Sequence, residues 1–540
     1  MANDPQLIIW GARIRTLDPQ QPFCTAVAIH DGLIVATGDD DSIRALRGPG
    51  TAVIDGRGIA FVPGLTDSHM HPISSSIATR GVDAFDAVTL EDLRAKLRAE
   101  AETLGPEDWV VGWGVHYEMF GPTGIRGDLI DEAVGGRPTY LRFFDGHSGV
   151  ANRAALQIAG VTGPVHFDEA ATVGVDEHGV PTGELLEGAA MHLVWDIVPP
   201  LSPQAEYARY QDSYRRFAQV GLTAVHAMEA TPDEFAIYQQ LEDRGDLLCR
   251  SIVPLWQSPH MTFDEMRDQI PLRDEHGALW RGGAVKFFID GVIETGTGWL
   301  THADTRGNGT LPFWPDPAKY AAAVSLFAEA GFQCITHSVG DGGVRCALDA
   351  YKAASAFPQN GLYGPHRIEH DELVEPADVP RFAAENVVAS MQPLHMAAMQ
   401  ADGSDEWADR AGPERTARAF PTRSLLESGA IVALGSDWSV APFDPRLGMA
   451  WVRLRRPPGQ LEMPPRAINQ ALTGLETLHG YTTGAAAAIN EGHLSGRIAP
   501  GFRGDLTGFA ADPVDTDADA LVDLPVLLTV MNGRITHQAV

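Results

Sequence analysis

Short apolar runs alternate with longer amphipathic segments through the middle of the chain, from about residue 61 to residue 437. Short runs bounded by turn residues predict strands, and the longer segments predict helices, for example Pro317–Ala330, Val344–Phe357 and Pro376–Ala384. The candidate strands are Phe61–His69, Leu222–Glu229, Arg250–Trp256, Ala284–Asp290, Gln333–His337, His366–His370, Val387–Pro393 and Ile431–Asp437. This alternation favours βα units, and eight strands predict an α/β fold of the (β/α)8 TIM barrel type.

The two ends of the chain show a different pattern, in which short strands are joined by tight turns. Asp31-Gly32 separates two apolar runs, and Asn532-Gly533 follows the apolar run Val526–Met531. Such dipeptides after or between apolar runs indicate β-hairpins. We expect residues 1–60 and 490–540 to form one small composite β-sandwich domain, and residues 61–489 to form the barrel.

An excess of sequence separates the first two predicted barrel strands. It extends from about residue 81 to residue 203 and contains strand-like runs of its own, at Trp109–Gly114 and Tyr140–Asp145. We therefore predict an inserted lobe that lies over the mouth of a distorted barrel.

Composition limits the partners. The formal net charge is −31, from 40 basic and 71 acidic residues, which argues against nucleic acid or an anionic membrane surface. The N-terminus has no signal-peptide pattern, no apolar stretch could span a bilayer, and the four cysteines lack C-x-x-C spacing. We expect a cytoplasmic protein that acts on a small molecule. A homodimer would fit soluble enzymes in general, but no segment specifies its interface.

Side chains that can bind a metal recur at the ends of the predicted strands. His69 and His71 are separated by one residue, so both imidazoles point to the same side of an extended strand. Two neutral imidazoles side by side can start a metal site, although an isolated pair can also be a solvated strand end. In a parallel barrel the carboxyl ends of all strands meet on one face. The residues expected there are His69, His71, Lys286, His337, His370 and Asp437.

Each of these residues also has an ordinary structural interpretation. The two later histidines could be hydrogen-bonded core residues, and Asp437 could cap the helix that follows it. Lys286 could be an ordinary lysine in an ion pair with Asp290 or Glu294. Because all six would converge on one face of the barrel, a functional site is favoured.

The chain resembles the amidohydrolase superfamily, and within it the amidohydrolase 3 group, which includes N-substituted formamide deformylase-like enzymes. The resemblance covers nearly the whole chain. Its motifs are VPGLTDSHMHP at Val62–Pro72, DGHSGVANRAAL at Asp145–Leu156, GVPTGELLEGA at Gly179–Ala189, GLTAVHAME at Gly221–Glu229, VKFFIDG at Val285–Gly291, ITHSVGDGGV at Ile335–Val344, HRIEHDELV at His366–Val374 and ALGSDWSVAPFDP at Ala433–Pro445.

The resemblance implies roles for these residues. His69, His71 and Asp437 would hold one divalent metal ion, usually zinc. His337 and His370 would hold a second ion, or one of them would contact the substrate if the site holds a single ion. Asp437 would take a proton from the attacking water and pass it to the leaving nitrogen of an amide-type C–N bond.

Lys286 would carry a carbamate derived from carbon dioxide, which would bridge the two ions. A lysine ammonium has no lone pair and would repel a metal, whereas a carbamate is an anionic oxygen ligand. The loop after this strand, Val292–Trp299, departs from the family pattern. Because this loop lies where the substrate should sit, the resemblance does not identify the substrate.

A second set of residues is expected to contact the substrate. His147 and His226 match family positions near the pocket, and both could equally be structural histidines. Aromatic and polar candidates are Trp113, His116, Tyr117 and Glu118 in the lobe and Trp299 after the fourth strand. Such aromatic residues could instead be ordinary packing residues.

Three functions remain open from the sequence. The first is a metal-dependent amidohydrolase that cleaves a C–N bond, in an amide that could be N-substituted or aromatic. The second keeps the same site but hydrolyses an ester, lactone, carbamate or phosphoester. The third is a non-catalytic scaffold protein with this fold, which the complete set of metal-binding residues disfavours.

Overall fold

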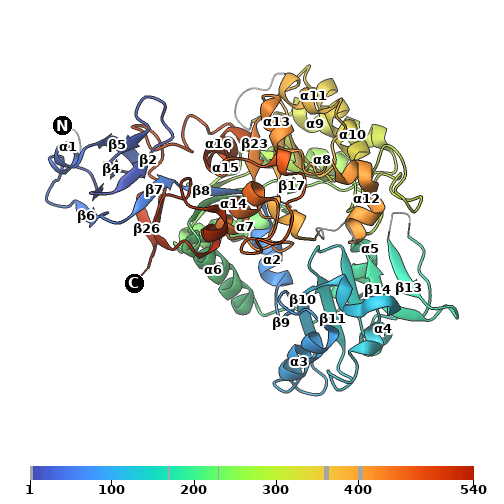
Figure 1. Cartoon of the computed structure of the whole chain (residues 1–540). Coiled ribbons are helices and arrows are strands. Elements are labelled where there is room, and N and C mark those ends of the chain that lie inside the picture. Colours follow the sequence, from blue (N-terminus) through green and yellow to red (C-terminus); the bar gives the residue numbers. More distant parts are fainter. Residues whose placement is uncertain (1–3, 168–170, 229, 358–363, 399–404, 540) are drawn as a thin grey trace.

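The computed structural model describes residues 4–167, 171–228, 230–357, 364–398 and 405–539. It has the mixed α/β character that the sequence predicts, with two parallel sheets at its centre and helices around them (Figure 1). One sheet contains β8 (Leu65–Met70), β15 (Leu222–Ala227), β16 (Arg250–Ile252) and β18 (Trp280–Arg281). The other contains β17 (Leu255–Trp256), β19 (Ala284–Phe288), β20 (Gln333–Ser338), β21 (Arg367–His370), β22 (Val388–Met391) and β23 (Val432–Leu434).

The two parallel sheets adjoin each other at both ends. The predicted strand Arg250–Trp256 consists of two short strands, β16 and β17, which are separated at Pro254, a residue without an N–H for the ladder. At the other end, Met70 forms a parallel bridge with Trp438. The carboxyl end of β8 therefore lies beside the segment that follows β23.

Two predicted strands extend beyond the observed ones. β23 ends at Leu434, so Asp437 lies in the segment after the strand and not at its last position. β15 ends at Ala227, and Glu229, which closes the predicted strand, lies outside the described residues. At β23 the chain therefore leaves the ladder just before it reaches Asp437.

The predicted strand Phe61–His69 is also two strands, because it breaks at Gly64. β7 (Ala60–Pro63) pairs with β24 (Leu506–Phe509) in a sheet outside the parallel pair, whereas β8 pairs with β15. A Cβ atom on Gly64 would lie 2.2 Å from Thr223 Oγ1, so only glycine allows the close approach at this junction. One continuous apolar run thus serves two different sheets.

Strands from both ends of the chain share one mixed sheet. Its order is β26-β25-β24-β7-β2-β3, where β2 (Arg13–Arg15) and β3 (Phe23–Cys24) come from the N-terminal part and β25 (Val526–Met531) and β26 (Arg534–Gln538) from the C-terminal part. A neighbouring sheet holds β1 (Leu7–Trp10), β4 (Ala26–His30), β5 (Leu33–Gly38) and β6 (Ala52–Asp55). The predicted turns at Asp31-Gly32 and Asn532-Gly533 join β4 to β5 and β25 to β26. In Figure 1 these blue and red strands lie side by side.

The segment between β8 and β15 has a sheet and an apolar core of its own. Its strands are β9 (Val82–Asp83), β10 (Val110–Val115), β11 (Thr139–Phe143), β12 (Ser148–Ala151), β13 (Thr172–Val175) and β14 (Pro181–Leu186). Leu93 and Leu97 of α3 (Leu90–Ala101) pack with Val110, Leu141 and Val150. This cyan part of Figure 1 holds more strands than the two runs that the sequence indicated.

Helices follow many of the parallel strands, and α6 (Pro203–Gln219) shows how they form. The Ser202 side chain accepts a hydrogen bond from Ala205 N and caps the helix, which begins with a proline. Tyr210, Tyr214 and Phe217 are buried at helical spacing. The predicted helices are observed as α9 (Pro317–Glu329), α10 (Asp341–Ala354) and α11 (Val379–Ala384). Among the described residues, no helix combines the length and the apolar character needed to cross a bilayer.

Candidate metal centre

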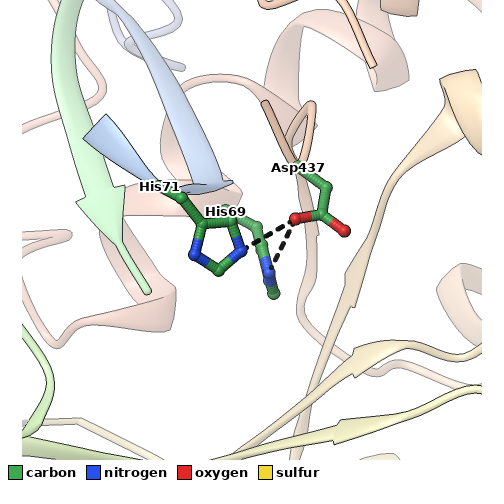
Figure 2. Close-up of side chains that lie close together, drawn as sticks. All are labelled: His69, His71 and Asp437. Carbon is green, nitrogen blue, oxygen red and sulfur yellow. Dashed lines mark hydrogen bonds and ion pairs between the residues drawn. The ribbon is translucent and has the colours of Figure 1, made fainter. Parts of the chain in front are cut away.

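His69, His71 and Asp437 are brought together where β8 meets the segment after β23. His69 lies in β8, and His71 immediately precedes α2 (Pro72–Ala78). Asp437 N donates to His69 O at 2.7 Å, which aligns the two segments. The Nε2 atoms of His69 and His71 lie 3.4 and 3.0 Å from Asp437 Oδ1 (Figure 2). Both imidazoles therefore face one carboxylate oxygen, as the H-x-H spacing predicts.

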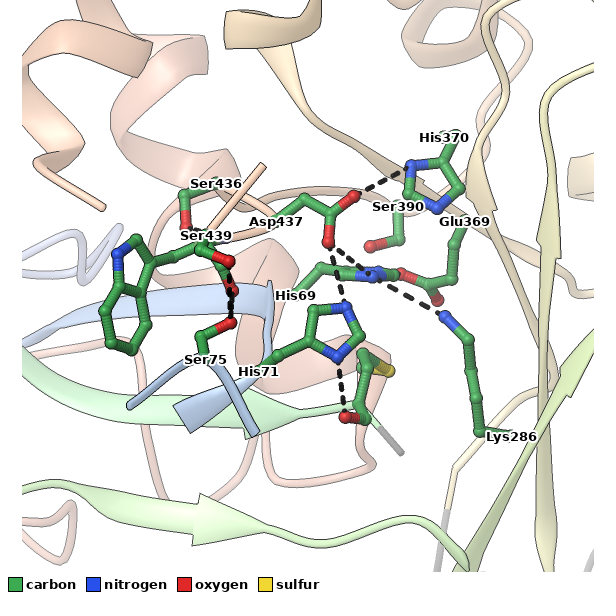
Figure 3. A network of polar contacts seen from close by, with 12 residues as sticks. His69, His71, Ser75, Lys286, Glu369, His370, Ser390, Ser436, Asp437 and Ser439 are labelled. Atoms are coloured by element: carbon green, nitrogen blue, oxygen red, sulfur yellow. Dashed lines mark hydrogen bonds and ion pairs between the residues drawn. The ribbon is translucent and has the colours of Figure 1, made fainter. Parts of the chain in front are cut away.

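The other ring nitrogen of each histidine is held by an oxygen atom. His69 Nδ1 lies 2.6 Å from Glu369 Oε2, and His71 Nδ1 lies 2.9 Å from the backbone oxygen of Met228 (Figure 3). These oxygens can only accept, so Nδ1 carries the proton and the Nε2 lone pair points toward Asp437. Metal-binding histidines in proteins are usually oriented in this way.

Glu369 is itself anchored by a buried cation. Arg367 Nε donates to Glu369 Oε1 at 2.9 Å, and Arg367 Nη2 donates to Glu369 Oε2 at 3.1 Å. Burial raises the pKa of Glu369, but Arg367 and His69 outweigh it and lower the pKa to about 2. The carboxylate that orients His69 is thus ionised across the working range of pH.

Asp437 is ionised for the same kind of reason. Burial raises the pKa of its carboxyl group, but the surrounding imidazoles, His69 first, hold the pKa well below its usual value. Asp67 helps to place both segments, because its Oδ1 accepts hydrogen bonds from His69 N and Ser436 N at 3.1 and 3.0 Å. An anionic oxygen therefore faces the two imidazoles in a fixed geometry.

A second group of possible ligands lies on the other side of Asp437. His370 Nδ1 and His395 Nε2 lie 3.8 and 3.4 Å from Asp437 Oδ2. The ligand atoms of these three residues all lie within 4.8 Å of one another. His395 was not identified from the sequence. It lies in the 3₁₀ helix η4 (Pro393–Ala398), just past the predicted strand Val387–Pro393, so a search extended beyond strand ends would have included it.

Lys286 and His337 lie close by, outside these two groups. Lys286 Nζ is buried 3.5 Å from His69 Nε2, on β19. His337 stacks on Phe288, and its Nε2 lies 3.3 Å from the backbone oxygen of Gly291. The structure therefore brings all six predicted ligands to one place, but one nitrogen of His337 faces the backbone oxygen of Gly291.

Two cavities meet at these residues. One, of about 280 Å³, is lined by His337, His370, Asp437 and the lobe residues His116, Tyr117 and Glu118. The other, of about 500 Å³, is lined by His69, His71, Lys286 and the same three residues from the first cavity, His337, His370 and Asp437. His147 lines both cavities. Burial lowers the pKa of His147, but Glu187, 2.9 Å from its Nδ1, more than offsets this and raises the pKa to about 9.

Three predicted substrate contacts lie elsewhere. Trp113 lines a separate cavity of about 380 Å³. Trp299 packs against the main apolar core, and its backbone N–H donates to Asp290 Oδ2 at 2.9 Å. His226 is buried, and its Nδ1 lies 2.9 Å from Arg367 Nη1, in the network beneath the site. The structure does not place these three side chains with the ligand groups.

The sequence profile of the amidohydrolase family matches residues 52–537, and the chain belongs to this family. Protein LONG AFTER FAR-RED 3 of Arabidopsis thaliana is 28% identical over 98% of this chain and 91% of its own length. The N-substituted formamide deformylase of Arthrobacter pascens is 26% identical over 100% of this chain and 99% of its own. A metal-dependent hydrolase of Pyrococcus horikoshii, 20% identical, superposes with a TM-score of 0.73 over 95% of this chain and 99% of its own, which shows a shared fold.

Proposed function

We propose that the protein is a metal-dependent hydrolase that cleaves an amide-type C–N bond in a small molecule. The observation that carries the proposal is the set of lone pairs at His69, His71 and Asp437. Each imidazole is locked with Nε2 toward the same ionised oxygen, and His69 and Asp437 are almost completely buried. Family membership supports hydrolysis at a C–N bond, and the deformylase relative acts on one such class of amide.

The donor set fits a divalent ion, and we propose zinc. Imidazole nitrogens with a carboxylate oxygen are the ligands that zinc commonly has in hydrolytic sites. Buried imidazole nitrogens of His370 and His395, which have no hydrogen bond within the part of the chain that the structure describes, extend this donor set. When bound, zinc supplies a Lewis acid and acidifies water.

The residues around the site supply the proton transfers. Asp437 is ionised and faces the cavities, so its carboxylate accepts a proton from water and returns it to the leaving nitrogen. His337 and His370 line both cavities, and His337 is placed there to orient the scissile carbonyl group. His147, protonated beside Glu187, is placed to donate a hydrogen bond to the substrate.

Lys286 is included in this proposal as a carbamate. Its Nζ is buried 3.5 Å from the Nε2 of His69, where an ammonium group would oppose a neighbouring cation. Loss of the ammonium proton would leave a neutral amine, and its reaction with carbon dioxide, with release of a second proton, would give a carbamate that is an anionic oxygen ligand. As a carbamate, Lys286 would be a metal ligand and would no longer carry a positive charge.

The architecture forms part of the same proposal. We infer that the two parallel sheets form one distorted (β/α)8 barrel, supported by the Ala230–Leu255 and Met70–Trp438 bridges at their junctions. Residues 1–60 and 490–540 would form the composite β domain, and residues 81–203 the inserted lobe. The site would then lie at the carboxyl ends of the barrel strands, in the cytoplasmic enzyme that the sequence predicts.

The proposal is tested by metal content and by a substrate panel. Protein purified without chelator should hold about one or two equivalents of zinc or a similar ion, measured by plasma mass spectrometry. N-formyl and N-acyl amines should release amine faster than the matching esters release alcohol. His71→Ala should lose both metal and activity, whereas His178→Ala, at a side chain 77% exposed on the lobe, should keep both.

Two results would count against it. Faster hydrolysis of the esters, lactones or phosphoesters in the panel would be consistent with the metal site but would show that the enzyme cleaves a bond other than C–N. If the wild-type protein neither contains nor takes up a metal ion, the hydrolytic mechanism is excluded and the role of a non-catalytic scaffold protein is favoured.

A further inference from the structure

We propose that His395 is a metal ligand and that, with His370 and Asp437, it holds a second divalent ion. This inference rests on the proposed function, because it places the second ion beside the first. It also changes the expectation from the family resemblance, in which His337 and His370 shared that ion. The carboxylate of Asp437 would then link the two ions through its two oxygens.

His395 is oriented in the same way as the two histidines of the first group. Its Nδ1 lies 3.1 Å from Glu372 Oε1, and Glu372 is fixed in turn by Trp407 Nε1, which donates to Oε2 at 2.7 Å. The Nε2 atom therefore points toward Asp437 Oδ2, at 3.4 Å. His69 has the same arrangement. One carboxylate, that of Glu369, contacts its Nδ1, and a second, that of Asp437, faces its Nε2.

The buried ring nitrogens of His370 and His395 also point to a bound cation. Among the described residues, neither His370 Nδ1, His370 Nε2 nor His395 Nε2 has a hydrogen-bond partner. Nearly all buried polar atoms in native proteins are satisfied, so these three nitrogens, two of which lie 3.4 and 3.8 Å from Asp437 Oδ2, require an explanation. A bound cation satisfies imidazole lone pairs that no protein donor reaches.

The spacing of the ligand atoms also fits a bound zinc ion. Zinc bonds to nitrogen and oxygen are about 2.0–2.1 Å long, so neighbouring ligand atoms of a tetrahedral site are about 3.3 Å apart. Asp437 Oδ2 lies 3.4 Å from His395 Nε2 and 3.8 Å from His370 Nδ1. The first group has the corresponding distances of 3.0 and 3.4 Å from Oδ1. Figure 3 shows His370 on the far side of Asp437 from His71.

His337 fits the second ion less well than His395 does. Its Nε2 is 3.3 Å from the backbone oxygen of Gly291 and 3.7 Å from Asp290 Oδ1. A proton on this nitrogen makes it a donor to Gly291, so this nitrogen offers no lone pair to an ion. His337 remains beside the ring of His370, at a centroid distance of 4.3 Å, where it can contact the substrate.

The test counts metal ions in the full-length protein. Chelator-stripped wild type and variants are titrated with zinc, and bound zinc is measured by plasma mass spectrometry after desalting. We expect two equivalents in the wild type and one in His395→Ala. The matched control is His116→Ala. His116 lines the same cavity, but its ring packs against Phe85 and Phe144, so this variant should retain two equivalents of zinc.

Glu372→Gln provides a second variant that keeps the His395 ring. We expect the dissociation constant of the second ion to rise about 10–100-fold, with the first ion unaffected, because the carboxylate behind the ring is lost. Titration of stripped protein with cobalt, followed by its visible absorption, measures the two sites separately. Unchanged second-site affinity in this variant would contradict the assignment even if His395→Ala failed to fold.

The outcomes separate this inference from the proposed function. Two equivalents in folded His395→Ala, or only one in the wild type, would overturn the second site and leave the hydrolase proposal in place. Loss of both ions from folded His395→Ala would also overturn it, because His395 would then belong to the first site. Absence of any bound ion in the wild type would overturn both proposals.

Discussion

Glu369→Gln tests how the protein holds the first metal ligand. Glu369 is completely buried, and it accepts hydrogen bonds from His69 at 2.6 Å and from Arg367 at 2.9 and 3.1 Å. Glutamine has nearly the same shape and no charge. The substitution therefore removes the charge-assisted part of these bonds and leaves the guanidinium group without its counter-charge.

The structure gives the size of the effect. Arg367 and His69 outweigh burial and lower the pKa of Glu369 from 4.5 to about 2, which corresponds to about 3 kcal/mol in favour of the ionised carboxylate. A hydrogen bond to a charged group contributes roughly 1.5–3 kcal/mol. Carboxylates behind metal-binding histidines change metal affinity by about 10–100-fold, or ~1.4–2.8 kcal/mol. We therefore expect the dissociation constant of the first ion to rise about 10–100-fold.

The assay is competition for zinc with a chromophoric chelator at pH 7, on protein shown to be folded by circular dichroism. The lowered pKa of Glu369 means that its contribution is complete above about pH 4.5 and is lost as the pH falls toward 2, so pH 7 measures all of it. Glu177→Gln, at a side chain 87% exposed, is the control and should bind zinc as the wild type does. Wild-type affinity in Glu369→Gln would refute the argument that this carboxylate orients His69 for a metal.

Three other substitutions test separate parts of the molecule. Lys286→Ala should be inactive and regain activity with short carboxylic acids, whereas unchanged metal content and rate in Lys286→Gln would exclude the carbamate. The raised pKa of His147, about 9, means that its ion pair with Glu187 stabilises the protein fully below about pH 6.5 and is lost as the pH rises through 9. Thermal unfolding of Glu187→Gln should therefore differ from wild type at pH 6 and converge with it above pH 9, and equal curves at pH 6 would contradict this. Gly64→Ala should cost about 1–3 kcal/mol and lower the melting temperature, because its Cβ would lie 2.2 Å from Thr223 Oγ1; an unchanged temperature would show that the junction can relax.

The sequence predicts the first ligand group because that group depends on local rules. Period-two alternation places His69 and His71 on one side of β8, and the meeting of parallel strand ends brings Asp437 to them. Neither step requires knowledge of side-chain packing. The same convergence of strands includes Lys286 and the two later histidines, the family motifs imply their roles, and the structure places all of them nearby.

These local rules do not identify residues whose role depends on which side chains surround them in the folded protein. His395 lies in a 3₁₀ helix after β22, where no hydrophobic period marks it, and its partners Glu372 and Asp437 are distant in sequence. Trp113 and Trp299 illustrate the opposite error. Both have the residue type of a substrate pocket, but one lines a different cavity and the other packs on the core. Residue type alone does not determine which surface a side chain faces.

The backbone at the site explains why its ligands can be positioned before an ion binds. His370 and Asp437 have φ values of 78° and 61°, in the left-handed region that residues other than glycine rarely adopt. Such conformations cost on the order of 1–3 kcal/mol each and persist only where surrounding contacts fix them. For Asp437 the contacts are the hydrogen bond from its N to His69 O and those that Asp67 accepts from His69 N and Ser436 N. The bonds that fix Asp437 thus join it to the strand that carries His69, so folding of β8 against the segment after β23 sets the distance between the ligands.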